Sequence, residues 1–401
     1  MTTTINASVA SGIVATGDTS GVLGLQANGT TIATISSTGV AVTGSVTTNG
    51  VVGSPYTMKN RIINGNMVID QRYAGTATAN TISNFVVDRW WVGQIGTTGK
   101  IIAQQNAGSV TPPAGFSNYL GITSQSAYSV GAAQEYTVQQ PIEGYNIADL
   151  SFGTASAKSV TLSFWVRSSL TGTFAISLRN ATTNRSYVST YTISSANTWE
   201  QKTITVAGDT SGTWLTTNGA GIYLDFDLGS GSSLSTTANT WTTGNYTTTS
   251  GVTNVVGTNG ATWYVTGVQL EAGSSATQFE WRPYGMELSL CQRYYAVFGG
   301  DTSSADTYQA FTIGLAYSAT LVRGVFNLPV NMRTAPSVTS SGSLRCFDGT
   351  TSSAGTSIAI DNNNLKTPLV QLTTSSMTTG RAIVMSQSAD NTAKVMFSAE
   401  L

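Results

Sequence analysis

Hydrophobic residues alternate with polar ones along much of this chain, and turn sequences separate the alternating runs. A period of two places successive side chains on opposite faces of a β-strand. Four central runs show the pattern, with these positions expected to face inward: Val160, Leu162, Phe164 and Val166; Phe174, Ile176 and Leu178; Ile222, Leu224, Phe226 and Leu228; Tyr264, Thr266, Val268 and Leu270. Because Gly, Asn and Asp turns join the runs, residues 56–284 are predicted to form one antiparallel β-sandwich domain.

The first 55 residues continue the alternation with smaller side chains. Valines alternate with small residues in the run 40–46 (VAVTGSV), and Asn-Gly pairs at 28–29 and 49–50 mark turns. A segment this short can hardly bury a core by itself. We therefore predict that residues 1–55 form a β-strand stalk or anchor whose apolar faces meet sister copies or a docking partner. The alternative is a flexible linker, but a linker has no use for regularly spaced Val, Ile and Leu residues.

The last third of the chain is predicted to contain a short helix followed by a second β domain. In residues 285–295 Leu288, Cys291 and Tyr295 recur at helical spacing, which favours a connector helix. Alternation resumes in residues 296–401 and continues through the final run at 393–401. We expect these residues to form a small C-terminal β-sandwich, and the whole protein to be mostly β.

Composition narrows the classes of function. Only 9% of the residues are charged, the formal net charge is −1, and the chain contains no histidine. A Ser-His-Asp triad, a Cys-His pair and a His-ligated zinc site are therefore excluded within this chain. Without a basic excess or an apolar run long enough to span a bilayer, we expect no nucleic-acid partner and no membrane insertion. The prediction is a structural or binding protein, with no enzymatic activity, no bound metal and no cofactor.

Cys291 and Cys346 are the two cysteines. Disulfide frameworks are typical of small secreted domains with more cysteines, so two buried, reduced thiols are the preferred interpretation over a bridge between them.

Several short passages, taken in order, resemble one protein family. The passages are 60–67 (NRIINGNM), 88–91 (DRWW), 164–169 (FWVRSS), 197–200 (NTWE), 264–271 (YVTGVQLE) and 287–295 (ELSLCQRYY). This succession resembles a group of bacteriophage and prophage tail-fibre or virion-fibre proteins, whose central region is similar to the jelly roll of carbohydrate-binding modules. The passages 328–333 (LPVNMR) and 396–401 (MFSAEL) resemble C-terminal domains of the same group.

The resemblance implies a homotrimer in the virion, assembled in the host cytoplasm and exposed on the particle. Residues 1–55 would attach it to tail or neck/adaptor proteins, and the jelly roll would recognise a bacterial surface glycan without catalysis, so that the protein mediates host adsorption. One alternative is a head fibre or capsid-decorating protein. A second alternative is a polysaccharide depolymerase.

Two strands supply candidates for a glycan-binding face, because sugars need aromatic rings for their C–H faces and polar groups for their hydroxyls. Tyr223, Asp225 and Asp227 alternate on one strand, while Trp165 and Arg167 share a face of another. The competing interpretation is that Trp165 and Tyr223 pack under a loop or a sister subunit.

Asp225 and Asp227 are the two carboxyl groups that a depolymerase would use. At positions i and i+2 of a strand they lie about 7 Å apart on one face, within the separation of about 6.5–9.5 Å used by inverting glycosidases. Paired carboxylates are common on strands, however, and catalysis requires one of them to have a raised pKa.

Trp241 and Tyr246, in a Ser/Thr-rich stretch, are the last candidates for glycan binding. Trp241 is equally well explained as a side chain that fills a gap in the core.

The resemblance also implies a calcium site. The resemblance to carbohydrate-binding jelly rolls implies Asn64, Asn66 and Glu271 as oxygen donors for Ca²⁺. No D-x-D-x-D loop is present, and an Asn64-Gly65 turn is the preferred interpretation.

The passage 88–91 is interpreted as a buried ion pair or hydrogen-bonded corner covered by tryptophan.

Overall fold

The computed structural model describes the backbone of residues 23–27, 30–36 and 39–42, and residues 58–79, 83–182, 184–302 and 305–401. The chain forms two compact units, residues 1–57 and 58–401. In the first unit an antiparallel sheet has the order β1-β2-β3, with β1 at Leu23–Ala27, β2 at Thr30–Ser36 and β3 at Gly39–Val42. Strands are therefore present at 23–27, 30–36 and 39–42, and residues 43–46 of the predicted run 40–46 lie outside the described residues.

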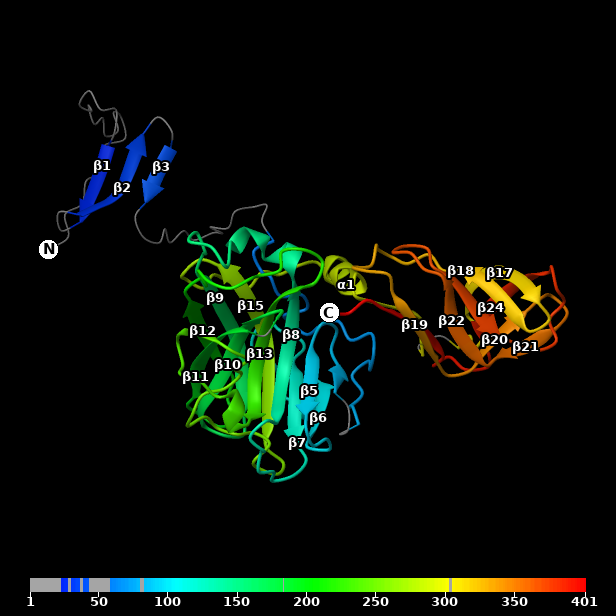
Figure 1. The fold of residues 1–401 in the computed structure, drawn as a ribbon, viewed down its shortest axis with the longest axis horizontal. Coiled ribbons are helices and arrows are strands. Elements are labelled where there is room, and N and C mark those ends of the chain that lie inside the picture. The colour runs from blue at the N-terminus through cyan, green and yellow to red at the C-terminus, as the bar shows by residue number, and fades with distance from the viewer. Residues whose placement is uncertain are drawn as a thin grey trace, which may run out of the picture. The chain divides into compact units, whose positions relative to one another are not determined.

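Two antiparallel sheets form the sandwich in the second unit (Figure 1). The seven-stranded sheet has the order β14-β11-β10-β13-β8-β5-β4, and the five-stranded sheet has the order β12-β9-β15-β7-β6. The first sheet contains β4 (Asn84–Phe85), β5 (Trp91–Ile95), β8 (Glu135–Glu143), β10 (Gly172–Asn180), β11 (Arg185–Ile193), β13 (Ala220–Ser230) and β14 (Trp241–Thr243). The second contains β6 (Ile101–Gln105), β7 (Leu120–Ser124), β9 (Val160–Ser168), β12 (Glu200–Val206) and β15 (Thr262–Ala272). This is the expected jelly-roll architecture, and 3-10 turns occur at Ala107–Ser109, Gly144–Asn146, Ala148–Leu150 and Ser232–Leu234.

The core lies between these sheets, where the predicted inward faces of β9, β10 and β13 meet. All eleven residues predicted to face inward on these three strands are fully buried. Phe164 of β9 packs edge-on against Phe226 of β13, with ring centroids 5.0 Å apart. The alternation therefore identified one face of each strand correctly, because burial of apolar area selects a single register.

The prediction for β15 is wrong over its first half. A register irregularity between Thr266 and Gln269 reverses the alternation, so Trp263 and Val265 face the core while Tyr264 packs with Tyr119 on the outer side. Gly267 lies at the irregularity with φ of 61°, where a Cβ would come within 2.6 Å of the Phe116 ring. After this bulge Val268 and Leu270 face inward as expected.

The connector helix is shorter than predicted. Helix α1 covers Tyr284–Gln292 and follows Pro283, and β16 already begins at Tyr295. Cys291 is buried as expected, whereas Tyr295 belongs to a strand and so does not extend the helical face. Cys291 and Cys346 are both free and buried, as predicted. Among the described residues, no helix has the length and apolar character needed to cross a membrane.

Residues 295–398 form the second β domain, again from two antiparallel sheets. One sheet has the order β16-β25-β19 and the other β21-β20-β24-β17-β18-β23-β22. The strands are β16 (Tyr295–Gly299), β17 (Ala310–Ser318), β18 (Leu321–Val325), β19 (Ser337–Ser341), β20 (Leu344–Phe347), β21 (Ser352–Gly355), β22 (Ser357–Asn362), β23 (Leu369–Thr373), β24 (Ala382–Gln387) and β25 (Lys394–Ser398). Phe326 and Phe397 pack together in its core, with ring centroids 5.2 Å apart.

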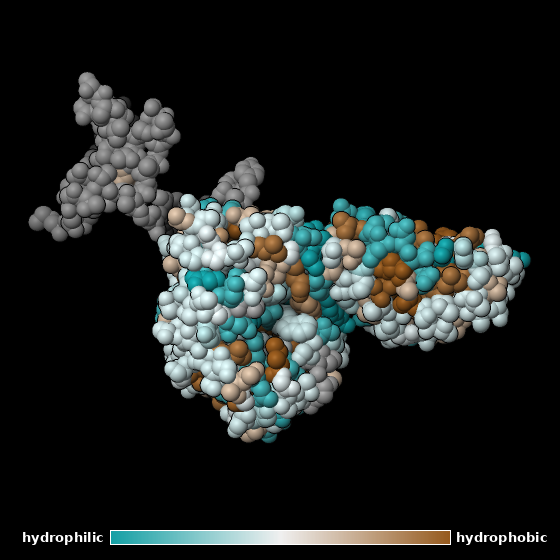
Figure 2. Space-filling model, viewed as in Figure 1, coloured by the Kyte–Doolittle hydropathy of each residue, from teal (hydrophilic) through white to brown (hydrophobic). Residues whose placement is uncertain are grey.

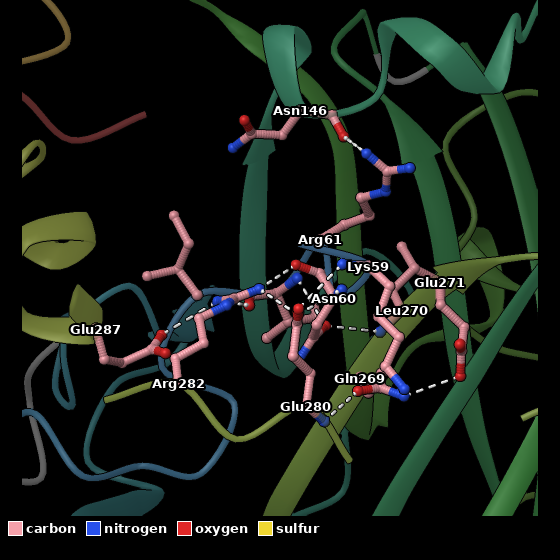
Figure 3. A network of polar contacts seen from close by, with 12 residues as sticks. Lys59, Asn60, Arg61, Asn146, Gln269, Leu270, Glu271, Glu280, Arg282 and Glu287 are labelled. Carbon is pink, nitrogen blue, oxygen red and sulfur yellow. Dashed lines mark hydrogen bonds and ion pairs between the residues drawn. The ribbon is translucent and has the colours of Figure 1, made fainter. Parts of the chain in front are cut away.

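Polar contacts fasten the start of the sandwich domain to β15 (Figure 3). Asn60 accepts hydrogen bonds from the backbone N–H of Ile62 and Leu270, at 2.9 and 3.1 Å, and donates to the carbonyl of Val268 at 3.1 Å. The Glu280 carboxylate accepts from the Asn60 N–H at 2.9 Å and pairs with Arg282 at 3.1 Å. Residues 208–220 positions apart in the sequence are thereby held side by side.

A buried ion cluster joins the chain's last residues to the passage 88–91. Glu400 pairs with Arg89 and, at 2.8 Å, with Arg72, which lies 3.4 Å from Asp88. Trp90 is fully buried, and its indole N–H donates to the carbonyl of Asn64 at 3.0 Å. The interpretation of 88–91 as a structural corner with a buried ion pair is therefore confirmed.

Replacing Glu400 with Gln should lower the free energy of unfolding by about 3–5 kcal/mol, because the buried guanidinium of Arg89 loses its counter-charge and Arg72 keeps only Asp88. Asp361→Asn is the matched control, since it breaks the Arg323–Asp361 pair, whose side chains are 30% and 26% exposed. The control should change stability by less than about 1 kcal/mol. Urea unfolding measures both variants, and equal losses would show that burial of the Glu400 cluster contributes nothing.

Candidate functional site

The outer face of the seven-stranded sheet contains a hollow of about 400 Å³. This face is turned toward the viewer in Figure 2, where the hollow contains both hydrophobic and hydrophilic residues. Strands β4, β5, β8, β10 and β13 supply most of its lining, which consists of Phe85, Trp91, Ile95, Glu135, Thr137, Gln139, Arg179, Tyr223, Asn245 and Leu401. We call this hollow the sheet cavity.

Strand register explains why these side chains converge. Trp91 lies opposite Gln139, and Gln139 lies opposite Asp225, so one row crosses β5, β8 and β13. Tyr223 lies opposite Arg179 in the neighbouring row. Because facing residues on adjacent strands point to the same side, the sheet presents aromatic and hydrogen-bonding groups together on one surface.

The aromatic side chains occupy the β5 edge and the centre of the sheet cavity. Trp91 and Tyr223 are partly exposed, and Phe85 packs against Trp91 in an edge-to-face arrangement with centroids 5.5 Å apart. Phe85 is buried and lies opposite Trp91 on the neighbouring strand, so it supports the Trp91 indole from the side. Rings held in this way cost little side-chain entropy when a ligand stacks on them.

A buried ion pair forms the polar floor. Arg179 donates through Nε and Nη2 to the two oxygens of Asp225, both at 2.9 Å, and through Nη1 to Asn245 at 2.6 Å. Gln139 and Ser177 also donate to Asp225, at 2.6 and 3.0 Å. Arg179 lies 3.4 Å from Glu135 as well. The only cation in the lining is thus already neutralised by carboxylates of the chain.

Two further carboxyl groups lie close to this pair. Burial raises the pKa of Glu135 to about 7, opposed by Arg179 and reinforced by the charges of Asp225 and Asp227. Burial likewise raises the pKa of Asp227 to about 6, opposed by hydrogen bonds from Thr248, Ser230 and Gly229. This cluster contains three carboxyl groups, those of Glu135, Asp225 and Asp227, and one guanidinium, that of Arg179. When all three carboxyl groups are ionised, the formal charge of the cluster is −2, from three negative charges and one positive.

The structure separates the glycan candidates found in the sequence. Tyr223 lines the sheet cavity, while Asp225 and Asp227 share its face but are buried beneath the surface. Trp165 and Arg167 are on β9 of the other sheet, on the opposite side of the sandwich. The two groups therefore do not come together.

Arg167, Trp241 and Tyr246 have local structural contacts. Arg167 donates to the carbonyl of Asn197 at 3.0 Å and lies 5.5 Å from the Tyr264 ring. Trp241 packs against the core cluster, 5.4 Å from the Trp214 ring, and donates to the carbonyl of Ala207. This corresponds to the core-plug alternative for Trp241. Tyr246 is half-buried, with its ring against the backbone of Gly244.

Sequence reasoning missed most of the cavity lining, Trp91 and Arg179 above all. The passage 88–91 is more than a structural corner, because Trp90 faces the core while Trp91 lines the cavity. Extending the period of two from Trp91 through Gly93 to Ile95 predicts a strand whose outward face begins with the Trp91 indole. No comparable signal marks Glu135 or Gln139, because their roles depend on which strands are neighbours.

The carboxylates predicted for a depolymerase are held by donors from the chain itself. Four hydrogen bonds reach Asp225, and Oδ1 of Asp227 accepts from Gly229 and Ser230 at 2.9 and 2.8 Å. An inverting glycosidase needs one carboxyl that can reach the leaving oxygen and another that can activate water. Both oxygens of Asp225 are already committed to Arg179, so this residue is poorly arranged for either task.

Two of the calcium donors implied by the resemblance, Asn64 and Glu271, make hydrogen bonds within the chain. Asn64 bonds to the backbone of Ile69 and Asp88, and Glu271 accepts from Thr277 and Gln269. Over the described part of the chain, no group of three or more His, Cys, Asp or Glu side chains is arranged to hold a metal ion. The alternative of a hydrogen-bonded turn fits Asn64, whose carbonyl accepts from the Met67 N–H at 3.1 Å.

No family model matches the chain. No curated protein matches it either. Among solved structures, it is similar to the enzymatically active domain of tailspike protein 4 from Bacteriophage CBA120, with 12% identity and a TM-score of 0.29 over 53% of this chain; the match spans about a fifth (21%) of the tailspike. A structure named CBM4 matches with 16% identity and a TM-score of 0.28, over 52% of this chain and 98% of its own. A Family 11 Carbohydrate-Binding Module from Clostridium thermocellum matches with 12% identity and a TM-score of 0.26, over 49% of this chain and 96% of its own.

Proposed function

We propose that the protein binds a glycan in the sheet cavity and does so without cleaving it. The observation that carries this proposal is the convergence of Trp91 and Tyr223 with the polar groups of Gln139 and Asn245 in one open hollow. Aromatic faces match the C–H faces of sugar rings, and amide groups can both donate to and accept from sugar hydroxyls. The buried Arg179–Asp225 pair supports the absence of cleavage, because it removes Asp225 from acid–base chemistry.

The polar floor also limits the class of glycan. A guanidinium can bind a carboxylate or phosphate only through N–H groups that are free, and Asp225, Glu135 and Asn245 engage four of the five N–H groups of Arg179. Glu135 adds negative charge at the cavity wall. We infer that the preferred ligand is an uncharged polysaccharide, since an acidic one would face repulsion without a compensating cation.

We further propose that the protein is a fibre component of a bacteriophage particle and uses this site in adsorption to the host surface. The succession of passages resembling virion-fibre proteins supports this role. Residues 1–55 would attach the homotrimer to other virion proteins. Several weak sites engaging one surface would then give strong attachment through their effective concentration.

Trp91→Ala and Tyr223→Ala should each weaken binding to an uncharged bacterial surface polysaccharide by about tenfold, which corresponds to about 1.4 kcal/mol. The lost interaction is stacking of a ring on the sugar. Trp165→Ala is the matched control on the opposite sheet and should bind like the parent protein. Calorimetric titration measures affinity, and a reducing-end assay on the same mixtures should stay at background. Equal losses in all three variants, or new reducing ends, would contradict the proposal.

Binding of a uronic-acid polysaccharide should weaken as the pH rises from 5.5 to 8.5. Glu135 becomes ionised as the pH passes its raised pKa of about 7, and the sugar carboxylates are charged throughout that interval. Glu135→Gln should remove most of this pH dependence, because an amide carries no charge at either end. The remainder belongs to Asp227, whose pKa of about 6 lies in the same interval. Parallel titrations at the two pH values, with an uncharged polysaccharide as the reference ligand, provide the measurement. A pH profile shared by parent and variant would exclude Glu135 as the cause.

Gold-labelled antibodies against residues 58–401 should decorate the tail fibres of particles that carry the protein. A chain lacking residues 1–55 should leave particles undecorated, since the attachment segment is gone. Particles carrying Trp91→Ala should be labelled normally, because that change lies outside the attachment segment. Electron microscopy gives the position directly, and labelling on the capsid would favour the head-fibre alternative.

A further inference from the structure

The C-terminal domain carries a row of apolar side chains on the uncovered face of its seven-stranded sheet. Ile313, Leu315 and Tyr317 alternate along β17 and are 72%, 47% and 55% exposed. Val325 of β18 is 44% exposed. Figure 2 shows hydrophobic residues gathered on this domain, in the area that Figure 1 labels β17, β18 and β22.

Register shows that these residues form one continuous surface across strands. Val384 of β24 lies opposite Ile313, and Gly314 pairs with Gly324, which brings Val325 beside Ile313. Val325 in turn lies opposite Leu369 of β23. We call this surface, from Val384 through Ile313 and Val325 to Leu369 with Leu315 and Tyr317 alongside, the β17 face.

The β17 face is separate from the core of its domain. Its strands turn their other sides inward, where Ala316, Val322 and Met385 are buried. An isoleucine that is 72% exposed contributes almost nothing to the fold of one chain. A contiguous apolar surface on a sheet is a common mark of a protein interface, and it promotes aggregation unless it is covered.

We propose that the β17 face is an interface with a second copy of this chain. Strands about 4.8 Å apart and up to about 30 Å long give the sheet a surface of several hundred Å², close to the roughly 800 Å² per partner of a standard protein interface. Interfaces between permanent partners are also the most apolar class, and another copy of the chain is the partner that is present whenever the protein is made.

Charged groups lie both within and beside the β17 face. Arg323 of β18 lies opposite Leu315, inside the face, where it stacks on Tyr317 at 3.9 Å and pairs with Asp361 at 3.2 Å. Arg381 precedes β24 and lies 3.9 Å from Asp348. Because both signs occur together, a second copy can meet this surface with opposite charges facing, whereas a surface of one sign would repel its copy.

Photo-crosslinking in the full-length protein tests this interface directly. p-Benzoylphenylalanine placed at position 313 should give adducts between two chains that map to β17 and its neighbouring strands. The same reporter at position 365, which replaces an exposed leucine of the same domain, should give no such adduct. Association through residues 1–55 alone cannot produce the expected pattern, because it does not bring two β17 faces into contact.

A substitution shows whether the contact is specific. With the reporter at position 317, Ile313→Lys should reduce the yield of chain–chain adduct at least about tenfold, whereas Leu365→Lys should not change it. Because Ile313 is so exposed, the lysine variant should keep the fold of the single chain, which circular dichroism verifies. Absence of the adduct at 313, adducts only to another protein or to glycan, or a yield unaffected by Ile313→Lys would overturn the proposal.

Discussion

The sheet cavity depends on the buried pairing of Arg179 with Asp225. This bidentate contact joins β10 to β13, and Gln139 extends it to β8, so the three central strands share one polar anchor. A carboxylate and a guanidinium can be this deeply buried only when nearly every lone pair and N–H group is satisfied. The geometry that meets this condition also determines which neighbouring side chains, Trp91 and Tyr223 among them, stand at the surface.

The same use of charge recurs elsewhere in the described parts of the chain. Glu143 binds Arg293 at 2.6 Å and accepts from Tyr294, and Asp209 binds Arg185 at 2.7 Å. In a chain with only 9% charged residues, many of these groups hold strands and domains together from inside. Uncharged polar residues such as Ser, Thr and Asn then make up much of the surface. Their side chains are hydrated but give little electrostatic repulsion between copies of the chain. Low charge is therefore consistent with an assembly of several chains.

Alternation in the sequence was sufficient to identify the strands and, for β9, β10 and β13, their buried faces. It failed in β15, because the bulge at Gly267 reverses the inward side and only a single glycine marks the change. It also could not show that Trp165 and Tyr223 belong to different sheets, since strand order is set by contacts between distant segments. Glu400 and Arg89, 311 residues apart, illustrate the same limit. Periodicity reports which side of a strand is buried, whereas neighbours in space determine a site.

The sheet cavity and the β17 face would have complementary physical roles. An open cavity with a few aromatic contacts would give modest affinity for one segment of the proposed glycan, because much of the ligand would stay in water. Repeating that cavity on linked copies would strengthen attachment without any new contact in the cavity itself. This gain requires that the copies be held together at distances a polysaccharide can bridge. An apolar sheet face in the C-terminal domain would supply such a constraint independently of residues 1–55, so recognition and assembly would be encoded on separate sheets of the same chain.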